Sequence, residues 1–197
     1  IVSPASLHNA VALDLALGGS SNTVLHLPAL AASFGLEFGI DRFDHLSRSV
    51  PHLCTLSPLG EHHMADLHRA GGAWAVLRRL ADGGLLEMEA ATVYGRGWTG
   101  LLAEVRVEDD RVIRPLAEPV HREGGIAILR GTLAPAGAVV KSAGVPAGLR
   151  RHTGPARVFD DGSLAARAIL EGRIGAGDVV VIRPEGPRGG PGMREML

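Results

Sequence analysis

Hydrophobic and polar positions follow a helical period through the first half of the chain. Between residues 22 and 34 the apolar side chains recur at spacings of three and four, which predicts an amphipathic helix. Ser20 or Ser21 can cap this helix, because a hydroxyl accepts from the otherwise unpaired amides of the first turn. Pro28 predicts a kink within it, and Gly35 predicts its end.

Shorter helices are predicted farther along the chain. Three segments share the helical period: 41–50, 64–70 and 74–80. Asp41 is the expected cap of the first and Pro51 its expected end. One or two helical turns are also expected within residues 99–104.

The second half changes to short β-rich runs separated by turns. These runs are predicted as strands: 92–94, 112–116, 125–131, 137–144 and 156–160. From residue 112 onward the spacing favours a small barrel or sandwich. A helix at 163–171, with Asp161 near its start and Gly172 at its end, interrupts the strands. The strand at 178–183 follows, and its unbroken apolar run predicts cover on both faces.

The polar run at residues 107–111 predicts a boundary between two parts, 1–108 and 109–197. The first part is mostly helical and the second is β-rich, so the fold class is predicted as α/β. The chain begins at Ile1 without a Met and ends at Leu197, soon after a glycine-rich turn. Both ends resemble cuts through a longer protein.

Composition and charge exclude several classes of protein. Hydrophobic residues make up 46% and charged residues 21%, which is ordinary for a soluble globular protein. With 20 basic and 21 acidic residues, no strong field attracts nucleic acid or an anionic membrane. No apolar stretch reaches the roughly 18 residues of a membrane span, and no signal peptide is recognised.

The single cysteine, Cys54, excludes an intrachain disulfide and an iron–sulfur cluster held by several thiolates of this chain. It is consistent with a cytoplasmic location. His52 could activate this thiol, but a small, partly buried residue is the favoured interpretation. His121 is interpreted as a loop histidine.

A glycine-dense segment at residues 185–195 is the most specific candidate for chemistry. Glycines let the main chain approach a ligand closely, and successive amides can form an anion-binding nest. Glu185 and Glu195 offer the carboxylate oxygens that a hard divalent cation prefers. From composition alone, a tight connection between a strand and a helix, with solvated charges, is the favoured interpretation.

Two other polar segments are weaker candidates. Residues 18–22 (GGSSN) place amides and hydroxyls at a helix start, which suits a carboxylate or phosphate; from the spacing alone, simple capping is the favoured interpretation. His62 and His63 stand four and three residues before Asp66, a spacing that permits shared metal ligation on a helix. No zinc pattern is completed, so a polar helix face is favoured there.

Taken together, the segments resemble the dihydroxy-acid and 6-phosphogluconate dehydratase family over essentially the whole chain. The resemblance is carried, in order, by ALGGSSNTVLHLPALA, FDHLSRSVPHL, MADLHRAGG, IRPLAEPVHREGGIAILRGTLAPAGAVVK, GPARVFD, AILEGRIGAGDVVVIR and EGPRGGPGMREML. VLHLPALA, SVPHLCTLSPLG and DLHRAGG are more similar to the amino-acid branch than to the sugar-acid branch. Ser21, Leu59 and Pro184 depart from the usual Thr, Ser and Tyr.

The resemblance implies a fold and an activity. The fold would be a helical flank of a larger α/β domain, followed by a β-barrel-like swivelling domain. Family enzymes dehydrate 2,3-dihydroxy acids, such as 2,3-dihydroxyisovalerate and 2,3-dihydroxy-3-methylvalerate, to 2-keto acids. An iron–sulfur cluster acts as Lewis acid on the C3 hydroxyl, a base removes the C2 proton, and Mg²⁺ stabilises the developing enolate.

The resemblance also implies site residues. Glu195 corresponds to a magnesium carboxylate, with Glu185 as the alternative. The residues expected to lie against the metal or the substrate are Gly189, Gly190, Gly192, Ser20, Ser21 and Asn22. The cluster cysteines and the base serine of the family fall outside these 197 residues, so we expect the chain alone to be inactive and the full-length protein to form a homodimer.

Two other functions remain open at this point. One is a sugar-acid dehydratase of the same family. The other is a non-catalytic module that binds anions through GGSSN and through GGPGM at residues 189–193.

Overall fold

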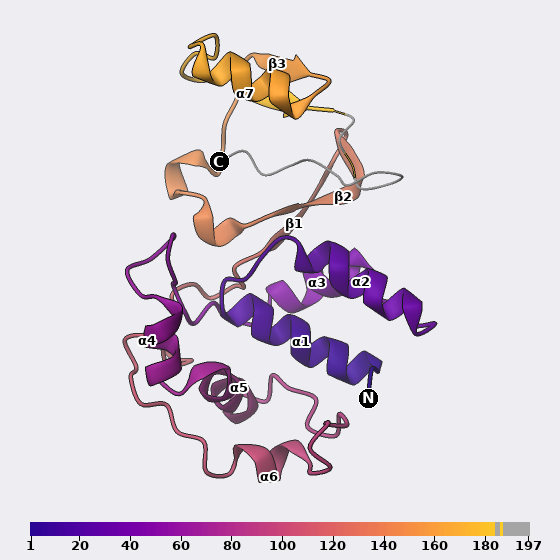
Figure 1. Cartoon of the computed structure of the whole chain (residues 1–197), viewed down its shortest axis with the longest axis vertical. Helices are drawn as coiled ribbons and strands as arrows, with labels where there is room; N and C mark the ends of the chain where they lie inside the picture. The colour runs from indigo at the N-terminus through magenta and orange to yellow at the C-terminus, as the bar shows by residue number, and fades with distance from the viewer. Residues whose placement is uncertain (184–185, 187–197) are drawn as a thin grey trace. The chain divides into compact units, whose positions relative to one another are not determined.

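The computed structural model describes residues 1–183 and 186. They fall into two compact units that divide between Val145 and Pro146. Helices and strands are mixed, as predicted (Figure 1). The strands of the described residues form two separate two-stranded sheets, and no barrel closes among them. The division predicted at residues 108/109 stays a prediction.

The first unit is built on helices. They are α1 (Pro4–Ala16), α2 (Thr23–Ser33), α3 (Ile40–Ser47), α4 (Met64–Arg69), α5 (Gly72–Asp82) and α6 (Trp98–Leu102). The sequence reasoning missed α1, which packs against α2, α3 and α5 (Figure 1). Its start is well defined, because Ser3 and Ser6 form a capping box ahead of an apolar run.

The helices α2 to α6 confirm the predicted segments, but not every predicted end. Asn22 is the N-cap of α2 and makes no side-chain capping bond, so the predicted serine caps are wrong. The helix continues through Pro28. Gly35 ends it as predicted, since its positive φ of 70° lets the Leu36 amide reach the Ala31 carbonyl at 3.0 Å.

The start of α3 also differs from the prediction. Gly39, not Asp41, is its N-cap. Asp41 lies in the first helical turn and forms an ion pair with Arg130 of the neighbouring hairpin. Its carboxylate therefore joins two elements instead of capping one.

Two predicted strands in this unit are turns. At 92–94, the Thr92 hydroxyl donates to the Arg96 carbonyl (2.6 Å) and closes a turn. At 112–116, Ile113 is fully buried in the helical core, but its amide bonds locally to Asp109. Apolar β-branched residues there fill the core without a partner strand.

A hairpin follows the helices. The strands β1 (Ala127–Gly131) and β2 (Ala134–Val140) pair antiparallel, with Ala127 opposite Val140, and the 3₁₀ turn η1 (Ser142–Gly144) comes after them. Both strands overlap predicted runs. The fully buried Ile126, directly before β1, belongs to the same apolar core as the helices and joins the hairpin to them.

The second unit is a β–α–β arrangement. After the 3₁₀ turn η2 (Ala147–Leu149), it contains β3 (Ala156–Phe159), α7 (Gly162–Leu170) and β4 (Val179–Ile182). The two strands are parallel and α7 packs on both.

Asp161 caps α7 as predicted, accepting from the amides of Ser163 (2.7 Å) and Leu164 (3.1 Å). The expected burial of β4 on both faces is wrong for the described residues. Val179 is 38% exposed, while α7 packs on both strands of the β3–β4 pair.

Candidate functional site

A pocket of about 250 Å³ lies where α1 ends. Its walls come from the Gly18–Gly19 turn, from the extended segment that follows Pro51, from Met64 at the start of α4 and from Lys141 after β2. The turn belongs to the predicted GGSSN segment. The other walls come from residues far away in the sequence.

Both glycines of the turn are required by close contacts within the chain. Gly18 has a φ of +64°, and a Cβ there would lie 2.3 Å from His52 Nε2. A Cβ on Gly19 would lie 1.8 Å from Asp14 Oδ1. The turn therefore needs glycine so that its own neighbours within the chain can approach it.

The amides of this segment also serve the fold. Gly18 and Gly19 donate to the carbonyls of Leu15 (3.2 Å) and Asp14 (2.8 Å). The Ser20 amide donates to Asp14 Oδ1 at 3.3 Å. These bonds leave few donors for an anion.

The polar side chains predicted to contact substrate, those of Ser20, Ser21 and Asn22, are not among the described residues that line the pocket. The Ser20 hydroxyl accepts from the Asn22 amide at 3.2 Å. A substrate role for these three residues stays a prediction.

Asp14 anchors the turn, and the sequence reasoning missed it. Its Oδ2 accepts from the Thr23 hydroxyl at 2.8 Å, which fixes the start of α2 to the end of α1. Burial raises the pKa of this carboxyl, while the bonds from Thr23 and Ser20 and the charge of Lys141 act against the rise. An acidic residue near the end of an apolar helix, just before a glycine pair, was the available signal.

His52 is the most buried polar side chain among the residues that line the pocket. It is 2% exposed, its Nε2 lies 2.7 Å from the Cys54 carbonyl oxygen, and its Nδ1 lies 3.0 Å from His121 Nδ1. Because a carbonyl only accepts, Nε2 carries the hydrogen, and the Nδ1 lone pair accepts from His121. Burial lowers the pKa of His52, so the ring is held neutral.

Cys54 is a buried structural residue. Burial raises the pKa of its thiol to about 12. His52 bonds to the Cys54 backbone and not to its sulfur, so the idea of an activated thiol is wrong. The interpretation as a small buried residue is confirmed, and such a thiol does not fit a cluster ligand.

The histidine-rich stretch before α4 forms a helix cap. Asp66 Oδ2 accepts from the His63 amide at 2.8 Å, and Asp66 Oδ1 pairs with Arg69 at 2.9 Å. The bond from the His63 amide is the main reason why the pKa of Asp66 is lowered. Across residues 1–183, no three His, Cys, Asp or Glu side chains gather as a metal site.

The glycine-dense segment falls almost entirely outside the described residues. Of that segment only Gly186 is described. The predicted residues outside are Glu185, Gly189, Gly190, Gly192 and Glu195. Within the described part of the chain, no helix has the length and apolar character to span a bilayer.

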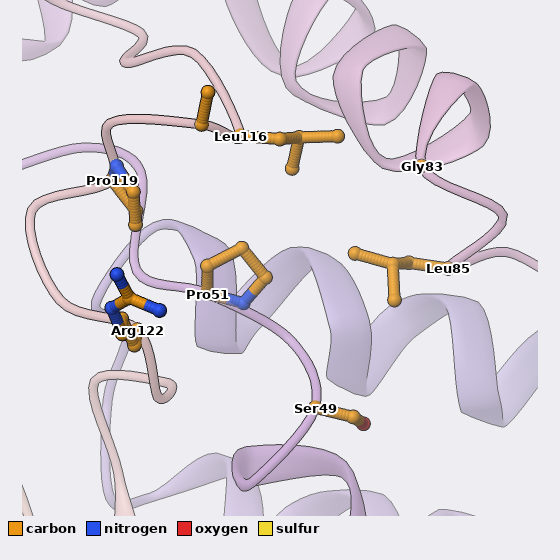
Figure 2. Close-up of a pocket in the computed structure, with 8 residues that line it drawn as sticks. Ser49, Pro51, Gly83, Leu85, Leu116, Pro119 and Arg122 are labelled. Carbon is orange, nitrogen blue, oxygen red and sulfur yellow. The ribbon is translucent and has the colours of Figure 1, made fainter.

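A second hollow, of about 450 Å³, lies beside the end of α5. Figure 2 shows the side chains of Pro51, Leu85 and Leu116 around a common space, with Arg122 at its edge. No carboxylate or imidazole of the described residues lines it. Arg122 is therefore the one titratable side chain among the described residues of its wall.

Two family models match the chain in succession. The N-terminal model of the dihydroxy-acid/6-phosphogluconate dehydratases covers residues 1–101, and their C-terminal model covers residues 111–197. The chain belongs to this dehydratase family. The two matches leave residues 102–110 between them, whereas the compact units of the structure divide at 145/146, so that the hairpin β1–β2 belongs to the first unit.

Curated relatives align along the whole chain. A dihydroxy-acid dehydratase of Solidesulfovibrio magneticus is 56% identical over 199 residues, covering 100% of this chain and 36% of the relative. One of Methanothermobacter thermautotrophicus is 54% identical over 198 residues, with the same coverage. One of Caldicellulosiruptor saccharolyticus is 50% identical over 192 residues, covering 98% of this chain and 35% of the relative. The chain thus spans about a third of the length of these dehydratases.

Proposed function

We propose that the chain is part of a longer dihydroxy-acid dehydratase. The full-length protein would convert 2,3-dihydroxyisovalerate and 2,3-dihydroxy-3-methylvalerate to 2-keto acids in valine and isoleucine biosynthesis. The observation that carries this proposal is the match of the whole chain, at 50% identity or more, to relatives named dihydroxy-acid dehydratase.

The cofactors of the full-length protein are proposed to be an iron–sulfur cluster and Mg²⁺. The described residues do not fit a cluster, since their one thiol is buried and has a pKa of about 12. The ligands of the iron–sulfur cluster would therefore come from outside this chain. Glu195 is the proposed magnesium carboxylate and Glu185 the alternative; a magnesium ion held there would supply positive charge to a developing enolate.

The family resemblance supports three further proposals for the full-length protein. Residues 1–108 would belong to the larger α/β domain, and residues 109–197 to a β-barrel-like swivelling domain. The protein would act as a homodimer in the cytoplasm.

Growth complementation tests the proposed function. The complete gene is introduced into a bacterium that lacks its own dihydroxy-acid dehydratase, and growth is measured without valine and isoleucine. Rescue is expected from the wild type but not from Glu195→Gln, since an amide cannot replace an anionic metal ligand. An expressed, cluster-containing wild type that fails to rescue would contradict the function, whereas rescue by Glu195→Gln would contradict only the ligand assignment.

A further inference from the structure

The hydrogen bond between the rings of His52 and His121 limits how many protons the two side chains can hold. His52 donates from Nε2 to the Cys54 carbonyl oxygen at 2.7 Å, so its Nδ1 accepts from Nδ1 of His121 at 3.0 Å. One additional proton can bind to Nε2 of the exposed His121 ring, and the bond survives. A second would have to bind to His52 Nδ1, the acceptor itself, and two N–H groups would then face each other.

The backbone around His52 joins three segments of the first unit. The His52 amide donates to the His121 carbonyl at 3.0 Å, and the Val120 amide donates to the His52 carbonyl at 2.9 Å. The next amide, that of Leu53, donates at 2.7 Å to the carbonyl of Ala16, the last residue of α1. The segment that contains His52 is therefore held on one side by the loop that contains His121 and on the other by α1.

Gly18 contacts both segments that the histidine pair joins. A Cβ on Gly18 would lie 2.3 Å from His52 Nε2, and a Cβ on Gly125 would lie 2.4 Å from the Gly18 Cα. The Gly125 amide also donates to the Leu15 carbonyl at 3.1 Å, which fixes the loop after His121 to α1. A movement of His52 away from His121 would therefore change the contacts of the turn and remove one wall of the pocket beside it.

A proton on His52 is unfavourable while the pair is closed. The ring is 2% exposed, and further chain in the full-length protein could only bury it more. Burial is the main reason why the pKa of His52 is lowered, and positive charge on His121 and Lys141 lowers it further. The Asp14 carboxylate accepts from the start of α2, and the Cys54 thiol, with a pKa of about 12, is uncharged. The titratable side chains on the segments around His52 are those of Asp14, Cys54, His121, Arg122, Glu123 and Lys141.

We infer that His52 and His121 form an acid-operated latch, which holds the Gly18 turn closed at neutral pH and releases it when both rings are protonated. Loss of the Nδ1–Nδ1 bond and repulsion between the two cations would separate the segment of His52 from the loop of His121. In the open state the His52 ring regains the ordinary pKa of 6.5, so acid favours opening. The latch is therefore closed above about pH 6.5 and opens as the pH falls below that value. It lies within the first unit and does not depend on the proposed function.

Hydrogen exchange of the full-length protein, followed by mass spectrometry at pH 7.5 and pH 5.5, tests the latch. The rates are corrected for the effect of pH on intrinsic exchange. Protection of the peptides that contain Gly18, His52 and Val120 should then fall by up to about 10-fold in acid, because the open state binds one more proton. Peptides of α5 should keep their protection, and a return to pH 7.5 should restore the original pattern.

Two variants separate the latch from general acid sensitivity. His52→Gln cannot take a proton, and its amide can still donate to the Cys54 carbonyl. His121→Gln changes only an exposed side chain, and its amide can either donate to His52 or accept from it, so the bond would survive protonation. Protection in both variants should be the same at the two pH values. The control His68→Gln, at an exposed position on α4, should respond to acid like the wild type.

His121→Gln decides the outcome even if His52→Gln does not fold. Loss of protection at the three segments in the wild type and in His68→Gln, but not in His121→Gln, would support the latch. Unchanged protection of the wild type at pH 5.5 would overturn it. An equal loss in His121→Gln, or a loss that extends to α5, would overturn it as well, because either result would mean that acid acts elsewhere in the protein.

Discussion

His52 and His121 stack with their Nδ1 atoms 3.0 Å apart, although 69 residues separate them in the chain. Backbone hydrogen bonds accompany the ring contact: the His52 amide donates to the His121 carbonyl (3.0 Å), and the Val120 amide donates to the His52 carbonyl (2.9 Å). The pair thus joins the segment after Pro51 to the loop before Gly124 and fixes one wall of the pocket.

Replacing His52 should destabilise the protein substantially. His52→Ala removes a fully buried ring and leaves the Cys54 carbonyl without its donor, at an expected cost of about 2–4 kcal/mol in the free energy of unfolding. Urea denaturation of the full-length protein measures this value. His68→Ala, at an exposed position on α4, should cost less than about 0.5 kcal/mol. Equal effects of the two changes would show that the buried histidine pair contributes nothing.

The same residue predicts a pH dependence of stability. Burial lowers the pKa of His52 below its ordinary value of 6.5, so between the two pKa values the unfolded chain binds more protons than the folded one. The contribution of His52 is therefore complete above about pH 6.5 and is lost as the pH falls below it, by at most about 1.4 kcal/mol per pH unit. The free energy of unfolding of His52→Gln should depend less on pH over this range, and an identical pH profile would contradict the assignment.

Gly18 should tolerate alanine much less well than Gly35 does. Both have a positive φ, 64° and 70°, but a Cβ on Gly18 would lie 2.3 Å from His52 Nε2, whereas a Cβ on Gly35 meets nothing within 4 Å. Gly35→Ala should cost about 1–2 kcal/mol from backbone strain alone. Gly18→Ala should cost at least about 1 kcal/mol more, which thermal or urea denaturation of the two variants would reveal. Equal costs would mean that the turn and His52 are not in close contact.

Cys54 should be inert toward alkylation in the folded protein. With a thiol pKa of about 12, almost none of it is thiolate at pH 8, and the side chain is buried. Iodoacetamide should therefore leave the peptide between Arg48 and Arg69 unmodified until urea unfolds the protein. Rapid labelling of native protein at this peptide would contradict the buried position.

Helical periodicity predicted α2 to α5 well, because each places an apolar stripe against the core. It did not find α1, whose apolar residues Leu7, Val11 and Leu15 are joined by buried alanines, so that no regular polar face marks the period. The capping signal of Ser3 and Pro4 was present in the sequence. The strand predicted at 112–116 was wrong because apolar β-branched residues fill a helical core as readily as they form a ladder.

The candidate pocket could be predicted only in part. The glycine pair and its position before a helix were visible in the sequence, but the contacts of Gly18 with His52 and of Gly19 with Asp14 were not. The approach of Lys141 to the same pocket depends on the hairpin β1–β2, which returns the chain to the end of α1. Spacing along the sequence carries no information about such long-range contacts.

The rate of 2-keto acid formation by the full-length protein, loaded with its cluster and Mg²⁺, tests the central claim most directly. We predict a kcat/KM for 2,3-dihydroxyisovalerate at least about 100-fold above that for 6-phosphogluconate or gluconate, because a site that buries an alkyl group leaves the hydroxyls of a sugar acid unpaired. An equal or higher kcat/KM for 6-phosphogluconate would place the protein in the sugar-acid branch and contradict the account.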